Sequence, residues 1–342
     1  MKPKTLTILI FSLTTLTSLR SLKPLKPVQH FRVMSYNVEN LFDTEDDPLT
    51  DDAEFLPSGN RRWTKGRYYH KLQQIAKVIN AAGEWDTPAL VGLCEVENDT
   101  VLTHLLSRTP LRNQHYVYCM THGSDKRGIN VALLYQRDKF RYIGHRSVPV
   151  NHRSVDARPT RDLLYVSGQV LTGDTLDVFV CHFPSKYGGE KESESRRMDA
   201  AKTLRGLCDS LVAVRVRPQI VLMGDFNVEP GSDCLLSVIG DDFANLFIGS
   251  HPEQLPGSQK YREEWSQIDQ IIVSKTLFFA TSGMQFKPGS ARTLSLPFLL
   301  TNDKTWRGKR PFRTYHGFKY EGGFSDHLPV IADFFLYLPD KE

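Results

Sequence analysis

The sequence predicts an α/β domain in which helices pack on the outside of sheets that are mixed or antiparallel. Short segments rich in β-branched and aromatic residues alternate with segments of helical periodicity, which is typical of layered α/β domains. Several strand segments follow one another without room for the crossover helix that a parallel pair requires. Antiparallel neighbours are therefore expected, and one domain is the simpler interpretation.

Eight segments have the composition of strands and are bounded by turn-forming residues. In chain order they are FRVMSYNV, PALVGLCEV, HYVYCM, INVALLY, LDVFVCHF, QIVLMGDFN, IDQIIVS and PVIADFFLY. Two helices are expected between them, because residues 72–79 and 204–211 each carry apolar side chains at i, i+3, i+4 and i+7. We expect the first helix to stop at Gly83 and the second to begin after Ser193.

Composition sets loose limits on function. The 342 residues are 40% hydrophobic, which is ample for a large core. The formal net charge of +4 suits an anionic substrate, but it is too small to require nucleic acid. The five cysteines include no CxxC pair, which argues against a zinc site. Cys94 and Cys181 lie in apolar runs and are expected to be buried.

The N-terminus has the pattern of a secretory signal. Lys2 and Lys4 precede an uncharged run over residues 5–19, which is too short and too rich in Thr and Ser for a comfortable membrane span. The alternative is a short uncleaved anchor, which the basic residues after the run and the lack of an A-x-A site support in part, and export is the favoured interpretation. We expect residues 1–29 to be a signal peptide or N-terminal anchor, and residues 30–340 to form the functional domain.

Polar side chains recur at the ends of apolar strand segments, where burial is costly unless they are paired or functional. Five segments show this pattern, with the residues Asn37 and Glu39, Glu95 and Glu97, His182, Asp225 and Asn227, and Asp326 and His327. Residues two apart in a strand point to one face, so Asn37 and Glu39, Glu95 and Glu97, and Asp225 and Asn227 are each expected to share a face. One such residue alone is usually a turn or cap residue. Carboxylates, carboxamides and histidines together indicate a site.

These residue types fit the hydrolysis of a phosphate ester. Oxygen ligands without cysteine suit Mg²⁺, with Mn²⁺ or Ca²⁺ as alternatives. Asparagine amides can donate hydrogen bonds to phosphate oxygens. A His–Asp couple can bind phosphate as an imidazolium or activate water as a general base.

The motifs SYNVEN, CEVEN, HFPSK, GDFN, SQIDQI and SDHLPV follow one another between about residues 31 and 335. In this order they resemble the endonuclease/exonuclease/phosphatase superfamily, and the HFPSKYGG and RTYHGFKYEGGFSDH stretches look like a bacterial, endonuclease-like branch of it. The resemblance implies a four-layer α/β sandwich, with two packed mixed β-sheets flanked by helices. It places the site where strand ends from both sheets meet.

The resemblance also implies a metal site. Glu95 matches the main metal ligand, and Glu39 and Asp326 match residues in or near the metal shell. Asn37 matches a group that holds the phosphate or the geometry of the ligands.

Five further matches are catalytic. Asp225 matches the acid that orients or deprotonates the attacking water, and Asn227 matches a group that holds the phosphate. His327, oriented by Asp269, matches the other candidate base or phosphate ligand, and the choice between Asp225 and His327 stays open. His182 matches a histidine at the phosphate.

Two departures from the family pattern concern the detailed mechanism. Cys94 stands where the family usually has Gln, and no acidic partner for His182 can be identified. Among the basic residues, Arg161, Lys186 and Arg196 are the candidates for binding substrate.

The sequence therefore predicts an exported, metal-dependent phosphodiesterase, a nuclease of low specificity with nucleic acid as its substrate. A first alternative is a phosphatase or phospholipase C-type hydrolase acting on an inositol phosphate, a sugar phosphate or a lipid head group. For a lipid substrate, residues 294–300 (LSLPFLL) are the one candidate for an apolar lip. A second alternative is a non-catalytic binding protein on the same fold. No protein partner is predicted.

The N-terminal pattern yields a first test. Expressed in a bacterium, the chain is expected in the periplasm or the medium because of its basic start and uncharged run. Cell fractionation combined with intact-mass measurement checks both the location and the cleavage. A full-length chain found only in the cytoplasm would contradict export.

Overall fold

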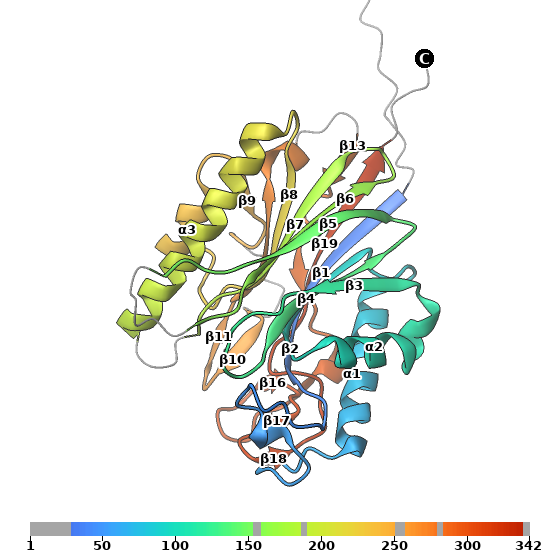
Figure 1. The fold of residues 1–342 in the computed structure, drawn as a ribbon, viewed down its shortest axis with the longest axis vertical. Helices are drawn as coiled ribbons and strands as arrows, with labels where there is room; N and C mark the ends of the chain where they lie inside the picture. The colour runs from blue at the N-terminus through green and yellow to red at the C-terminus, as the bar shows by residue number, and fades with distance from the viewer. Residues whose placement is uncertain (1–28, 153–158, 186–189, 250–256, 279–282, 338–342) are drawn as a thin grey trace, which may run out of the picture.

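The computed structural model describes residues 29–152, 159–185, 190–249, 257–278 and 283–337 (Figure 1). Residues 1–28, which hold nearly all of the expected signal or anchor, lie outside this description, as does Lys186. Within the described ranges, no helix combines the length and the apolar content needed to cross a membrane.

Two mixed sheets form the centre of the domain. The first, in the order of hydrogen-bonded neighbours, contains β13 (Gly283–Phe286), β19 (Val330–Tyr337), β1 (Gln29–Leu41), β2 (Leu90–Val96), β4 (Asn130–Gln136) and β3 (Tyr116–Met120), with β14 (Arg292–Thr293) also paired to β19. The second contains β5 (Phe140–Val148), β6 (Leu163–Val170), β7 (Thr175–His182), β8 (Gln219–Asp225), β12 (Asp269–Ser274) and β9 (Phe243–Asn245). Among these strands only β1–β2 and β7–β8 are parallel pairs.

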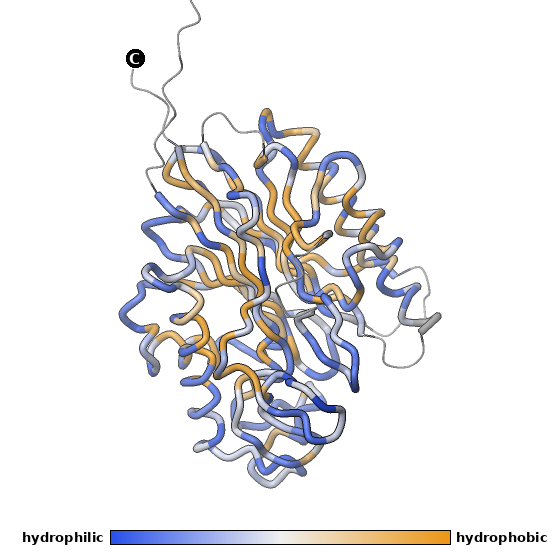
Figure 2. The backbone as a smooth tube through the Cα atoms, turned by 180° about the vertical axis from the view of Figure 1, so that it is seen from behind, coloured by the Kyte–Doolittle hydropathy of each residue, from blue (hydrophilic) through white to orange (hydrophobic). Residues whose placement is uncertain are grey.

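Helices cover the outer face of each sheet, which completes the four-layer α/β sandwich and confirms the expected fold (Figure 1). Buried apolar residues of α1 (Lys65–Gly83) and α2 (Asp99–Ser107) pack with the first sheet. Those of α3 (Glu190–Val214) and α4 (Asp233–Ile239) pack with the second. A third apolar cluster fills the space between the two sheets, and Figure 2 shows its hydrophobic strands running through the middle of the molecule.

Both expected helices form, and the first one stops at Gly83 as expected. Gly83 is the last residue of α1, and Glu84 takes the positive φ of 58° that stops the helix. The other end is set by Thr64, whose side chain accepts a hydrogen bond from the amide of Arg67. Helix α3 begins at Glu190 instead of after Ser193.

The remaining elements are short. They are the hairpins β10 (Gln259–Tyr261) with β11 (Glu264–Ser266), β15 (Leu300–Asn302) with β16 (Lys309–Pro311) and β17 (Tyr315–His316) with β18 (Lys319–Tyr320), and the 3₁₀ turns Ala53–Phe55, Pro110–Asn113, Lys275–Leu277 and Pro297–Leu299.

Residues 42–64 and 294–326 pack together into a region that we call the rim lobe, at the lower end of Figure 1. The rings of Trp63 and Tyr315 join the two segments, with their centroids 6.0 Å apart. Leu294 and Leu299 are buried in the same apolar cluster. Leu296, Phe298 and Leu300 are half-buried and pack against this cluster. The segment 294–300 therefore contributes mainly to the core and only in part to the apolar lip that the sequence suggested.

The strand directions bring all the polar strand ends to one edge. Because β1 and β2 are parallel, their carboxyl ends meet, and antiparallel β19 begins there, with Val330 opposite Ser35. The second sheet repeats this arrangement with β7, β8 and β12. Gly92 in β2 allows the sheets to approach closely, since a Cβ there would lie 2.9 Å from the sulfur of Met223 in β8.

Candidate active site

Three site residues form a row across the second sheet. His182 ends β7, Asp225 ends β8 and Asp269 begins β12, and the strand register pairs Asp225 with each of the other two. All three are buried. Because each side chain is at the end of a hydrogen-bonded, apolar strand, the row is held by the same backbone bonds and packing that build the sheet.

The side-chain amide of Asn37 connects the two sheets. Its Nδ2 lies 3.2 Å from Oε1 of Glu95, in the first sheet, and 3.1 Å from Oδ2 of Asp225, in the second. The side chain is 1% exposed. The first sheet also reaches the segment before β19 here, because the Ser325 hydroxyl donates to the backbone oxygen of Asn37 at 2.7 Å.

Several strand-end residues adopt a left-handed backbone conformation. The φ angles of Glu39, Asn40, Glu95 and Asn227 are 54°, 51°, 66° and 55°. This conformation costs a residue other than glycine about 1–2 kcal/mol, and such strain concentrates at functional sites. Here it turns the Glu95 carboxylate so that Oε2 accepts a hydrogen bond from the amide of Asn40 at 2.8 Å.

The prediction that Asn37 and Glu39 share a face is wrong, because the left-handed backbone at Glu39 interrupts the alternation of the strand. Glu39 instead accepts hydrogen bonds from the amides of Thr314, at 2.7 Å, and Tyr315, at 3.4 Å. Lys71 of α1 lies 3.9 Å from its Oε2. Burial, followed by the charge of Asp326, raises the pKa of Glu39 to about 7. Glu39 thus anchors the rim lobe, and its role in the metal shell stays a prediction.

Glu95 and Glu97 also separate. Glu97 accepts a hydrogen bond from the amide of Asp43 at 2.6 Å. Burial raises the pKa of Glu97 to about 8. Of the two carboxylates, only Glu95 contacts Asn37.

His327 and Asp269 form the couple that the resemblance implied. His327 Nδ1 lies 2.7 Å from Oδ2 of Asp269, and the Ser258 hydroxyl donates to the same oxygen at 2.6 Å. The other ring nitrogen of His327 is 2.9 Å from the side-chain nitrogen of Gln259 and 3.9 Å from Oδ2 of Asp225. One imidazole therefore joins the couple to the Asp225 carboxylate.

Burial and neighbouring charges push the pKa values of the site apart. Burial, followed by the charge of Asp269, raises the pKa of Asp225 to about 7. Burial alone would lower the pKa of His327, but the charge and hydrogen bond of Asp269 raise it well above its ordinary value. Burial and the charge of Arg161 lower the pKa of His182 well below its ordinary value. The site thus combines an acid that titrates near neutrality, a cationic imidazole and a neutral one.

His182 has acidic neighbours that the sequence could not identify. Its Nε2 lies 3.6 Å from Oδ2 of Asp225 and 4.0 Å from Oε1 of Glu95. Its buried Nδ1 has no hydrogen-bond partner among the described residues. Asn227 lies beside it, since its side chain donates to the backbone oxygen of Phe183 at 2.9 Å.

The predicted substrate-binding residues differ in position. Arg161 is buried and donates inside the protein, to Phe183 O at 2.6 Å and to Asp125 at 3.3 Å. Arg196 is half-buried on α3, and Lys186 lies outside the described residues. Contact of these three with substrate stays a prediction. Asp326, predicted near the metal, is paired with Arg313 at 3.1 Å.

Sequence reasoning missed four residues at the site. They are the amide of Asn40 and the side chains of Lys71, Ser258 and Gln259. A backbone amide has no side-chain signature, and Lys71 follows the ordinary pattern of a helix. Ser258 precedes β10 and Gln259 begins it, and an isolated antiparallel bridge to a distant segment places Gln259 opposite His327.

The donor set fits a hard divalent cation. Ligand atoms of Asp225, Asp269 and His327 lie within 4.8 Å of one another. An imidazolium cannot ligate a metal, however, and His327 already binds Asp269 through Nδ1. The Glu95 carboxylate is better placed, because its side chain keeps 15% of its surface exposed and Asn40 orients it. Mg²⁺ commonly binds proteins through one or two carboxylates, with water and phosphate oxygens completing its shell.

Comparisons with known proteins agree with the fold. A sequence model of the Endonuclease/Exonuclease/phosphatase family matches residues 32–336. An endonuclease/exonuclease/phosphatase family protein from Bacteroides thetaiotaomicron aligns with a TM-score of 0.58 and 15% identity, covering 92% of this chain and all of its own. A mannosyl-6-phosphatase from the same organism aligns at 0.56 and 16%, covering 89% and 99%. The human nocturnin catalytic domain with bound sulfate aligns at 0.54 and 15%, covering 90% and 94%. No curated protein sequence matches.

The raised carboxyl pKa values predict how stability depends on pH. In the unfolded chain these carboxyls lose their protons near pH 4, whereas in the folded protein Glu39 and Asp225 keep them to about pH 7 and Glu97 to about pH 8. Between about pH 4 and pH 8 the folded state therefore binds more protons than the unfolded chain, so the free energy of unfolding falls as pH rises through this range. His327, with its raised pKa, acts in the same direction, and the opposing contribution of His182 lies mainly at lower pH.

We expect the melting temperature in EDTA to fall between about pH 6.5 and pH 8, and to fall less in excess Mg²⁺, which favours charged carboxylates. Glu97→Gln should reduce the fall in EDTA, while Glu263→Gln, at an exposed position, should leave it unchanged. Differential scanning calorimetry measures all three. A melting temperature that rises across the window would show that these carboxyls are ionised in the folded protein.

Proposed function

We propose that this chain, which belongs to the endonuclease/exonuclease/phosphatase family, is a metal-dependent phosphodiesterase, a nuclease of low sequence specificity. Members of this family are phosphoesterase hydrolases that typically depend on a divalent metal. The observation that carries the proposal is the contact of Asn37 with both Glu95 and Asp225. This contact places a candidate metal ligand and a candidate base at one point, with His182 and the His327–Asp269 couple around it.

We assign the general base to Asp225. Its pKa of about 7 suits a group that must accept a proton from water at neutral pH and later release it. A cationic His327, held by Asp269 through Nδ1, would donate a hydrogen bond from Nε2 to a phosphate oxygen, in place of its contact with the Gln259 side chain, and stabilise the charge that develops there. The choice that the sequence left open is thereby proposed from the two raised pKa values, because the Asp225 carboxyl can lose its proton near neutral pH whereas His327 keeps its own.

The other residues orient the phosphate. His182, kept neutral by burial and by the charge of Arg161, offers one N–H without adding charge. Glu95 would hold the divalent cation, and the Asn37 amide fixes its carboxylate. When bound, the cation polarises the phosphate and stabilises the leaving oxygen. Water adds to phosphorus, its proton goes to Asp225, and the P–O bond to the leaving group breaks.

A phosphatase acting on a sugar phosphate is the second candidate, favoured by the structural similarity to a mannosyl-6-phosphatase. The same catalytic residues serve both reactions, so the rim and not the strand ends would select the substrate. A lipid substrate is less favoured, since residues 294–300 pack into the core. A non-catalytic role is also less favoured, because such a protein has no need for buried acids and histidines in contact.

A divalent cation and Glu95 are expected to be essential. EDTA and Glu95→Gln should each lower kcat by about 100-fold or more, since the loss of several kcal/mol of charge stabilisation costs tenfold per 1.36 kcal/mol. The assay compares plasmid DNA, RNA, a phosphomonoester panel and sphingomyelin with Mg²⁺, Mn²⁺ and Ca²⁺. Glu97→Gln is the matched control and should keep activity. Full activity in EDTA would reject metal dependence, and hydrolysis of monoesters alone would favour the phosphatase.

Asp269 and His327 should act as one unit. His327→Ala should lower kcat by roughly 10²–10⁴, and Asp269→Asn by somewhat less, because each removes the same positioned group. The double variant should be scarcely slower than His327→Ala, since coupled residues are not additive. Measurements of kcat and melting temperature for all four proteins decide this. Losses that multiply in the double variant would indicate two independent roles.

A further inference from the structure

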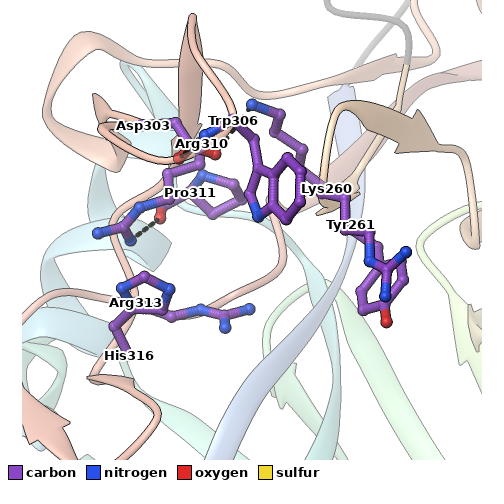
Figure 3. Close-up of a pocket in the computed structure, with 9 residues that line it drawn as sticks. Lys260, Tyr261, Asp303, Trp306, Arg310, Pro311, Arg313 and His316 are labelled. Carbon is purple, nitrogen blue, oxygen red and sulfur yellow. Dashed lines mark hydrogen bonds and ion pairs between the residues drawn. The ribbon is translucent and has the colours of Figure 1, made fainter.

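A pocket of about 260 Å³ lies beside the active site. One wall is the β10–β11 hairpin, and the other runs from the β15–β16 hairpin to β17 in the rim lobe. Figure 3 shows Trp306 at its centre, with Lys260 and Tyr261 on one side and Arg313 and His316 on the other. The volume is near the lower limit for small-molecule sites, about 300 Å³, so the pocket accommodates one small group and not a duplex.

Both walls are tied to catalytic residues. The side-chain nitrogen of Gln259, next to Lys260 in β10, lies 2.9 Å from Nε2 of His327. Arg313 lines the pocket and also pairs with Asp326 at 3.1 Å. Each wall therefore contains, or directly follows, a residue that contacts His327 or Asp326. A nucleotide in the pocket would be close enough to be linked directly to a phosphate bound at His327.

The cations of the pocket are only partly neutralised. Lys260 pairs with Asp303 at 3.0 Å and Arg310 with Glu321 at 2.8 Å. Arg262 and His316 face no carboxylate within 4.0 Å in the described part of the chain. The Arg262 guanidinium is positioned over the rings of Tyr261 and Trp306, at 5.3 Å and 5.9 Å from their centroids. The pocket thus keeps positive charge available for an anionic group.

The same pocket exposes aromatic rings. Trp306 is 41% exposed and Tyr261 is 69% exposed, although most aromatic side chains of the domain are buried. Exposed rings beside an unpaired guanidinium are the combination that binds single-stranded nucleic acid, with a base stacked on the ring and a phosphate at the cation.

We propose that this pocket binds one nucleotide of a single-stranded substrate, adjacent to the phosphate that is cleaved. Trp306 stacks on the base, and Arg262 and Arg313 bind the phosphate of that nucleotide. The proposal rests on the proposed nuclease function and specifies it further, since a pocket of this size selects unpaired ends or loops over duplex. A sugar phosphate would engage the cations but offers no flat ring to Trp306.

The test is the binding of a 5′-phosphorylated deoxydinucleotide, its abasic analogue and mannose 6-phosphate to the full chain in EDTA, measured by calorimetry. Trp306→Ala should weaken dinucleotide binding about 5- to 150-fold, as expected for one lost base–ring stack, and should not change binding of the abasic analogue. Trp306→Phe should restore most of the affinity. Arg262→Ala should weaken both nucleotide ligands. Trp85→Ala and Arg112→Ala, at exposed positions elsewhere, are the matched controls.

Equal dinucleotide affinity in Trp306→Ala and wild type, or tighter binding of mannose 6-phosphate than of the dinucleotide, would overturn the proposal. Cleavage of single-stranded DNA and RNA with Mg²⁺ separates it from the nuclease proposal. Cleavage with binding that ignores Trp306 rejects the pocket and keeps the nuclease. Trp306-dependent binding without cleavage of any strand keeps the pocket and rejects the nuclease.

Discussion

The side-chain amide of Asn37 is the contact on which the rest of the site depends. It donates to Glu95 in one sheet and to Asp225 in the other, and its backbone oxygen accepts from Ser325, which leads into His327. The two sheets meet mainly through an apolar cluster, whose packing fixes distance but discriminates weakly between neighbouring registers. A buried amide that is unsatisfied in any other register makes this one specific. The polar contact therefore sets the position of the catalytic groups relative to each other.

Placing several acids together at one buried position is unfavourable, because burial and mutual repulsion disfavour their charged forms. The same interactions set the different pKa values of the site residues. Asp225, Asp269 and His327 lie within a few ångströms of one another, so they cannot all be charged without compensation. His327 and Ser258 both bind Oδ2 of Asp269, whereas its buried Oδ1 has no hydrogen-bond partner among the described residues. The charge of this carboxylate raises the pKa values of both Asp225 and His327. A base and a cationic donor thus arise from one set of contacts.

The rim lobe depends on the same strand end. Left-handed residues after Asn37 direct Glu39 away from the site and toward the amides of Thr314 and Tyr315, next to buried Lys71. Lys71 also donates to Thr314 Oγ1 and Phe324 O. The segment that carries Trp306 and Arg313 is therefore anchored at Glu39, next to Asn40, whose amide donates to the metal-binding candidate Glu95. The end of β1 thus holds both the catalytic groups, through Asn37, and the rim lobe, through Glu39. Loops of the rim lobe can vary without moving the catalytic groups, which are held by the strands.

The sequence by itself determined the alternation of strands and helices, the polar strand ends and, through ordered motifs, the four-layer sandwich and most of the residues at its site. These properties are local, since periodicity and composition record which face of each element is buried. Only the tertiary structure decided where Glu39 and Glu97 point, because positive φ angles interrupt strand alternation without a glycine to signal them. It also decided the contacts of Gln259, Ser258 and Trp306, which depend on the register and packing of short hairpins far apart in the chain. Such contacts have no local signature, because they are formed by strand pairing across the whole domain.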